Sequence, residues 1–149
     1  MYHTRNVDAL AAALIELTGC LNSPRQDEIL LRAADVSLDR ALFPLLVRLS
    51  AENALSVAEL AEQAGRDPST VSRQLAKLEQ LGHIKRPARQ ADKRVRAAKI
   101  TKHGARTVAA IAEARRRLLG SLIQDWSDDE QRLFPVLLQR LSTAMKTGR

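Results

Sequence analysis

The sequence is poor in the residues that build disulfide and metal-bound scaffolds. Its 149 residues include one cysteine, Cys20, and only three histidines. A single thiol cannot form an internal disulfide, and His3, His83 and His103 lack the close spacing of a zinc cluster. We therefore expect no structural metal and no cofactor.

Long apolar runs and linker-like tracts are also missing. No stretch approaches the roughly 20 apolar residues of a membrane-spanning helix, and the N-terminal MYHTRNVDAL lacks the basic-then-apolar pattern of a secretory signal. We expect a cytoplasmic protein. No tract rich in glycine, serine or proline marks a linker, so the chain is expected to fold as one domain over 1–149.

The patterns that carry catalysis are absent from the sequence too. It shows no pairing of a nucleophile with a base, no glycine-rich phosphate loop and no metal-ligand spacing. His83 and His103 lie at predicted element junctions in the basic region, where we expect phosphate contact or solvent exposure rather than catalysis. An enzyme is therefore not expected.

Positive charge, in contrast, is abundant and concentrated. The chain has 24 Lys and Arg against 17 Asp and Glu, a formal charge of +7. Residues 65–106 hold twelve of the cations and three acids, so they carry +9 while the other 107 residues carry −2. A merely solvated surface would intersperse the two signs. The distribution indicates one surface for a polyanionic partner.

Apolar periodicity predicts the first helices of the chain. Residues at three-and-four spacing predict an amphipathic helix over 5–21, ended by the turn chemistry between Gly19 and Pro24. A second helix is predicted over 38–49. Pro44 would remove a backbone donor there, so that helix is either kinked or begins later.

Capping residues predict two further helices in the middle of the chain. Ser56, with a glutamate three residues later, is a capping-box signature for a short helix that stops at Gly65. Asp67 followed by Pro68 supplies an N-cap and a first-turn proline for the next helix, which runs to Leu81.

The pattern changes from helix to strand after these helices. Residues 83–87 and 97–100 are short strand candidates separated by a basic loop, so together they predict a hairpin. Thr101 can then cap a long helix, and Ser127 supplies a capping box for a last helix to about Met145.

Three long apolar-faced helices thus flank a compact basic centre. The centre, 38–101, is called the central lobe below. The helices at 5–21 and within 102–146 are available to pack against a second copy of the chain. We therefore expect a homodimer, with those two segments as its dimerisation region.

A short helix, a turn, a second helix and a basic hairpin are the parts of a winged helix-turn-helix. The central lobe, 38–101, is therefore predicted to be a winged helix-turn-helix DNA-binding lobe. In the second helix, Val71, Leu75 and Leu78 fall on one side, and the other side carries DNA-reading chemistry. Arginine can bind guanine, glutamine can pair with adenine, and a hydroxyl near a helix N-terminus can meet phosphate. The predicted contacts on this helix are Ser69, Thr70, Arg73, Gln74 and Lys77.

The predicted wing is rich in arginine and lysine. Cations on a thin hairpin suit the narrow, electronegative minor groove, and the single acid is expected to orient an arginine. The predicted wing contacts are Arg86, Arg89, Asp92, Lys93, Arg94 and Arg96. An ordinary solvated helix face and a loop made soluble by charge are the alternatives for the two sets.

The stretch LSVAELAEQAGRDPSTVSRQLAKLEQLGHIKR, followed by ADKRVRAAKITKHG, resembles the multiple antibiotic resistance regulator (MarR) family. The resemblance covers about 50 central residues. It implies a mainly α fold with a small β-hairpin wing and terminal dimerisation helices, bound as a dimer to a pseudo-palindromic double-stranded DNA operator. By the family's pattern, Ser69, Thr70 and Arg73 touch the major groove, and Asp92 and Arg94 make the wing contact.

The resemblance also implies regulation. Many relatives release DNA when a small aromatic or phenolic compound binds, so we expect a repressor released by such an effector, although no residue is assigned to it. A peroxide-sensing regulator acting through Cys20 is an alternative, but no cation lies within a turn before that thiol, and we expect a packed hydrophobic side chain. A winged-helix protein-interaction module without DNA binding is a second alternative.

Overall fold

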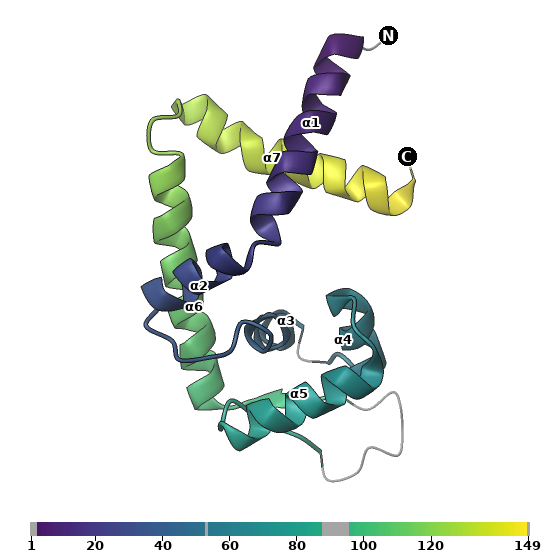
Figure 1. Cartoon of the computed structure of the whole chain (residues 1–149), viewed down its shortest axis with the longest axis vertical. Helices are drawn as coiled ribbons and strands as arrows, with labels where there is room; N and C mark the ends of the chain where they lie inside the picture. The colour runs from purple at the N-terminus through teal and green to yellow at the C-terminus, as the bar shows by residue number, and fades with distance from the viewer. Residues whose placement is uncertain (1–2, 53, 88–95, 149) are drawn as a thin grey trace. The chain divides into compact units, whose positions relative to one another are not determined.

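The computed structural model describes residues 3–52, 54–87 and 96–148, and its described part is mainly helical with one two-stranded sheet (Figure 1). The chain divides into two compact units, 1–114 and 115–149. Within the described residues, no helix is both long and apolar enough to span a membrane. The elements are α1 (Thr4–Leu21), α2 (Pro24–Ala33), α3 (Phe43–Ala51), α4 (Val57–Ala64), α5 (Pro68–Gln80), β1 (Ile84–Lys85), β2 (Lys99–Ile100), α6 (Lys102–Leu122) and α7 (Asp128–Thr147).

The core of the first unit lies in the central lobe. Figure 1 shows α3, α4 and α5 gathered as one group, and α3 contacts α4 while α4 contacts α5. Leucines from all three helices are fully buried there, and Ile84 and Ile111 complete the core from β1 and α6. Burial of each such side chain contributes roughly 1.5–3 kcal/mol, so this cluster fixes the orientation of α5.

The cap predictions are confirmed. Ser56 Oγ accepts the Glu59 backbone N–H at 3.2 Å, and the Glu59 carboxylate accepts the Ser56 N–H at 3.1 Å, which completes the capping box of α4. Gly65 ends α4 with φ +66°, a left-handed conformation that glycine adopts without steric cost. The chain can therefore turn sharply from α4 into α5.

Two features of the N-terminal half were not expected in full. The helix predicted at 38–49 begins at Phe43, so that Pro44 occupies its first turn, where a missing N–H costs little. Helix α2 was not predicted. Its first residue is Pro24, so the proline that ends the segment after α1 also starts the next helix.

The expectation for Cys20 is wrong for the single chain, because this thiol is exposed near the end of α1. No residue of α1 is buried between Thr4 and Leu21, all of which the structure describes. The helix forms as predicted but leaves its apolar side chains uncovered, Ile15 being 75% exposed and Leu21 68% exposed.

The hairpin connects α5 to α6. Strands β1 and β2 are antiparallel, and Ile84 pairs with Ile100 while Lys85 pairs with Lys99. Each described strand is two residues long, shorter than the predicted segments. Ala97 and Ala98 are buried, and the Ala97 N–H donates to the Leu55 carbonyl at 2.7 Å, which ties the end of the wing to the loop before α4.

Helix α6 begins against the end of α5. Thr101 caps it as predicted, since its Oγ1 accepts the Gly104 N–H at 3.0 Å and its hydroxyl donates to the Gly82 carbonyl at 2.6 Å. A Cβ at Gly104 would overlap the His83 carbonyl oxygen, so only glycine allows this approach. His83 is buried and stacks on the His103 ring at 4.5 Å, so exposure expected for His83 is wrong.

The second unit consists of the end of α6 and α7. Ser127 and Glu130 form the predicted capping box at the start of α7, and the Gln131 amide donates to two carbonyls of the preceding turn, at 3.0 and 3.2 Å. Helix α7 continues through Pro135 to Thr147. None of the described residues of α7 is buried, and its apolar side chains include exposed Phe134 and Leu137.

Candidate nucleic-acid interface

The N-terminal turn of α5 is held by Asp67. One carboxylate oxygen accepts the Thr70 backbone N–H at 2.9 Å, and the Ser69 and Thr70 hydroxyls both donate to the same carboxylate. These hydrogen bonds, the one from Ser69 being the largest cause, hold the pKa of Asp67 well below its usual range. The turn that presents Ser69 and Thr70 is therefore fixed before any partner binds.

The division of α5 into an inner and an outer side is confirmed. Val71, Leu75 and Leu78 are fully buried in the core. Arg73 and Lys77 are exposed on the opposite side. The guanidinium of Arg73 donates to Thr70 Oγ1 at 3.3 Å, so the arginine lies along the same outer face as the capped turn. The outer face offers two cations and two hydroxyl groups to a partner.

Gln74 lies half-buried beside this face and is held by Arg66, which was not among the predicted contacts. Arg66 donates to Gln74 Oε1 at 2.8 Å and to the Ala41 carbonyl at 2.7 Å. This guanidinium links the turn before α5 to the segment before α3. The basic run around Arg66 was visible in the sequence, but no local pattern indicates a partner 25 residues away.

Arg86 points back onto α5. Its guanidinium donates to the backbone carbonyl and the hydroxyl of Ser72, both at 3.3 Å, and its backbone N–H donates to the Glu79 carboxylate at 2.7 Å. These three hydrogen bonds fix the base of the wing against α5. The predicted DNA contact from Arg86 thus comes from a side chain that already has a structural role.

Of the remaining predicted wing contacts, the structure describes only Arg96. The predicted contacts Arg89, Asp92, Lys93 and Arg94 lie outside the described residues. Arg96 is described and exposed, directly before the buried Ala97. The structure therefore brings together Ser69, Thr70, Arg73, Gln74 and Lys77 on α5, with Arg86 and Arg96 at the two ends of the wing base.

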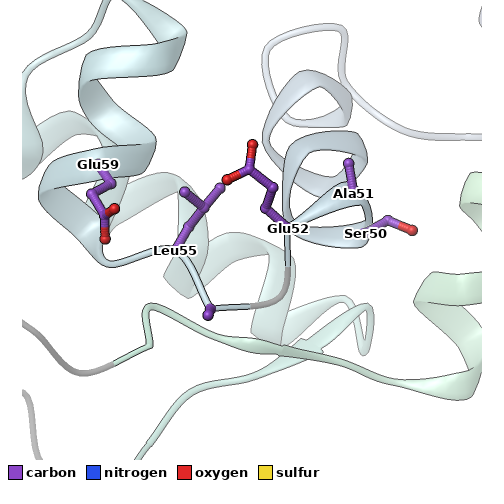
Figure 2. Close-up of a pocket in the computed structure, with 6 residues that line it drawn as sticks. Ser50, Ala51, Glu52, Leu55 and Glu59 are labelled. Atoms are coloured by element: carbon purple, nitrogen blue, oxygen red, sulfur yellow. The ribbon is translucent and has the colours of Figure 1, made fainter.

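Two hollows of opposite charge open on the central lobe. One of about 410 Å³ is lined by Arg73, Lys77 and Gln74 of α5 together with the Asp39–Leu42 segment. The other, of about 380 Å³, lies between the end of α3 and the start of α4, where Glu52 and Glu59 line it (Figure 2). In the first hollow the two cations outnumber the one carboxylate, Asp39, whereas the charged side chains of the second are both carboxylates. Since carboxylates repel phosphate, the first hollow suits an anion better than the second.

Comparisons with known proteins agree with this geometry. The MarR family model matches residues 38–95. The chain is 36% identical over 108 residues to the uncharacterized HTH-type transcriptional regulator YxaD of Bacillus subtilis strain 168, a match that covers 72% of this chain and 76% of that protein. The chain belongs to the MarR family. It is therefore a winged helix-turn-helix transcriptional regulator, which implies regulation through DNA binding. Regulators of the MarR family are not enzymes.

Solved structures of MarR proteins share the fold over nearly the whole chain. A MarR family protein from Bacillus stearothermophilus superposes with a TM-score of 0.81 at 23% identity, covering 98% of this chain and 99% of that one. Staphylococcus aureus MarR, solved in complex with salicylate and kanamycin, has a TM-score of 0.76 at 11% identity and covers 98% and 96%. The helix order is thus that of MarR proteins at both ends of the chain.

Proposed function

We propose that the chain is a homodimeric repressor that binds a pseudo-palindromic operator and is released from it by a small-molecule effector. The observation that carries this proposal is the outer face of α5. Asp67 fixes its first turn, the buried leucines fix its orientation, and Arg73 and Lys77 stand exposed beside the capped hydroxyls. A preorganised cationic helix face of this kind suits the major groove.

The contacts divide by chemistry. Arg73 is proposed to bind guanine O6 and N7, and Gln74 to face adenine. Ser69 and Thr70 lie where backbone amides of the helix N-terminus meet phosphate, and Lys77 extends the cationic face along the groove. On the wing, the proposed minor-groove contacts are Arg89, Lys93 and Arg94, with Asp92 orienting an arginine. Arg86 and Arg96 are proposed to serve DNA binding from the base of the wing, where Arg86 is bonded to Ser72.

The homodimer is supported by the uncovered apolar faces of the terminal helices. Val7, Leu10, Leu133, Phe134 and Leu137 are each between 41% and 51% exposed in the single chain. Exposed apolar side chains in such numbers mark an interaction surface. A two-fold dimer through 5–21 and 102–146 would present two α5 helices to half-sites about 34–36 Å apart, one turn of the duplex.

The decisive experiment is selection of bound sequences from a random duplex pool, followed by titration of the recovered sites at several salt concentrations. A palindrome with half-sites about one turn apart is expected, with affinity that falls steeply as salt rises. Salt-sensitive binding without sequence enrichment would indicate an architectural protein instead. Failure to bind duplex at low salt would overturn the proposal in favour of a protein-interaction module.

Two substitutions separate base reading from charge. Arg73→Ala is expected to relax the selected sequence at one position in each half-site and to cost about 1–3 kcal/mol on the preferred site. Arg94→Ala is expected to weaken most sites alike. Arg25→Ala removes an exposed cation from α2 and is the matched control. Equal effects of Arg25→Ala and Arg73→Ala would show that α5 does not read bases.

An effector of the small aromatic acid type is supported by the hollow beside α5 and by the salicylate complex of the staphylococcal protein. A carboxylate held between Arg73 and Lys77 would occupy the cations that the duplex needs. Salicylate titrated into the protein–operator complex is expected to release DNA at constant ionic strength. Benzyl alcohol, which keeps the ring without the charge, is the control, and equal release by both compounds would contradict an anionic site.

A further inference from the structure

The base of the wing carries a pair of like charges that the fold itself does not explain. Lys85 and Lys99 are directly opposite each other in the antiparallel register, and both are exposed. Their strand neighbours Ile84 and Ile100 turn toward the core, so the two lysines share the outer face of the hairpin. Like charges in opposed positions of a sheet are destabilising.

A third cation lies beside this pair. Arg96 and Lys99 both line a hollow of about 240 Å³ whose other walls are Leu49, Ser50 and Ile100. No ion pair with another described residue neutralises Lys85, Arg96 or Lys99. Lys99 is thus opposite Lys85 and beside Arg96, and the carboxylate nearest to this strand end in the described chain, that of Glu79, accepts the Arg86 backbone N–H instead of pairing with these cations.

The position of these cations is fixed relative to α5. Strand β1 contacts α5, and the Arg86 hydrogen bonds to Ser72 and Glu79 hold the first strand in place. The Ala97 hydrogen bond to the Leu55 carbonyl holds the second. The cations at the base of the hairpin are thus held in the same lobe as α5 by hydrogen bonds at both strands.

We infer that Lys85 and Lys99, with Arg96 beside them, hold one backbone phosphate of the duplex that α5 reads. A phosphate oxygen between the two ammonium groups would replace their repulsion with two charge-assisted hydrogen bonds. This inference rests on the proposed function. It assigns a positioning contact to the wing base, which fixes register on the duplex without reading sequence.

The test compares wild type with the Lys85→Gln/Lys99→Gln double variant on the selected operator. Loss of one phosphate contact is expected to make the slope of log K against log salt concentration less negative by about 0.9. The deficit of the variant relative to wild type should therefore shrink about 3.5-fold between 50 and 200 mM salt. The selected sequence should stay the same.

Thermal unfolding without DNA shows whether the double variant is correctly folded. Without DNA, the double variant should melt at the same or a higher temperature than wild type because the cross-strand repulsion is gone. Inorganic phosphate should stabilise wild type more than the variant. Lys85→Arg/Lys99→Arg should restore the salt slope, and Lys146→Gln, which removes an exposed lysine of α7, should leave it unchanged.

The possible outcomes distinguish failure of the phosphate contact from failure of the proposed function. If wild type binds its operator and the double variant shows the same slope and affinity, the phosphate contact is wrong and the proposed function stands. A double variant that melts below wild type would show that the lysines stabilise the hairpin instead. Absence of operator binding by wild type would overturn both proposals.

Discussion

The central lobe and the terminal helices are built from the same amphipathic pattern but end in opposite states. In the lobe, Leu45, Leu46, Leu60 and Leu75 have no exposed surface. In α1 and α7, both described along their whole length, no residue is buried. Periodicity therefore predicts that a helix forms, whereas the chain's own packing decides whether its apolar face is already satisfied. The apolar faces of the lobe are buried within one chain, whereas those of α1 and α7 are left exposed.

The largest effect should come from charging the uncovered faces. Leu10→Asp combined with Leu137→Asp places carboxylates on exposed apolar positions of α1 and α7. Because a dimer joins two half-site contacts, its loss should reduce operator affinity at least about 100-fold. Sedimentation should show a monomer. Circular dichroism should show that its helical content is retained.

The control for that variant is Gln139→Asp, which adds one carboxylate at an exposed polar position of α7. It should leave the dimer intact. A Leu10→Asp/Leu137→Asp protein that still sediments as a dimer would show that the lobe, and not the terminal helices, makes the interface.

A smaller effect should come from a cavity in the lobe. Leu75→Ala removes a fully buried side chain of α5 and is expected to lower the free energy of unfolding by about 2–5 kcal/mol. Ile15→Ala, at a position 75% exposed on α1, is the matched comparison. If a second copy covers α1, the cost of Ile15→Ala should depend on protein concentration in thermal unfolding. Equal, concentration-independent costs would remove the distinction between the two regions.

The local features of the lobe could be predicted from the sequence because they depend on residues close in the chain. Ser56 with Glu59, and Asp67 with Pro68, place two helix starts through hydrogen bonds within four residues. Helix α2 was not predicted because its apolar residues are few and only Leu31 is buried. The hydrogen bond from Arg66 to the Ala41 carbonyl could not be predicted, because it depends on how the turn before α5 packs against the segment before α3.

The same limit applies to charged residues of the candidate interface. Composition identified the basic region, and the helix period identified the outer face of α5. Neither could show that Arg86 is engaged by Ser72, or that Lys85 and Lys99 are opposed, because both facts depend on strand register. The register pairs Ile84 with Ile100, and it is set when both side chains pack against the core of the folded lobe.

Helix α6 has one glycine at its start, next to His83, and another near its end. Gly104→Ala places a methyl group against the His83 carbonyl and is expected to destabilise the protein by about 1–3 kcal/mol. Gly120→Ala meets nothing within 4 Å and should stabilise the helix by about 0.5–1 kcal/mol. Chemical denaturation measures the free energy of unfolding of both variants. Stabilisation by Gly104→Ala would show that the start of α6 does not approach the His83 carbonyl this closely.

The smallest effect is a pH dependence confined to the lobe. Burial, and secondly the positive charge of the neighbouring His103, lower the pKa of His83. Below about pH 6.5, the ordinary value for histidine, the unfolded chain binds a proton that the folded lobe disfavours. The contribution of His83 to stability is therefore present above that pH and is lost as the pH falls toward the lowered pKa.

Unfolding free energies measured between pH 7.5 and 5.5 should accordingly decline with acid in wild type and decline less in His83→Gln. The slope is the informative quantity, because His83→Gln also changes the ring stack with His103 and so shifts the free energy at every pH. His3→Gln, at the exposed start of the chain, is the control for loss of a histidine elsewhere. If His83→Gln keeps the full acid dependence, the buried ring does not couple protonation to the junction of α5 and α6. A reduced slope would instead show that this junction, closed by Gly104 and Thr101, excludes a charged imidazole in the folded lobe.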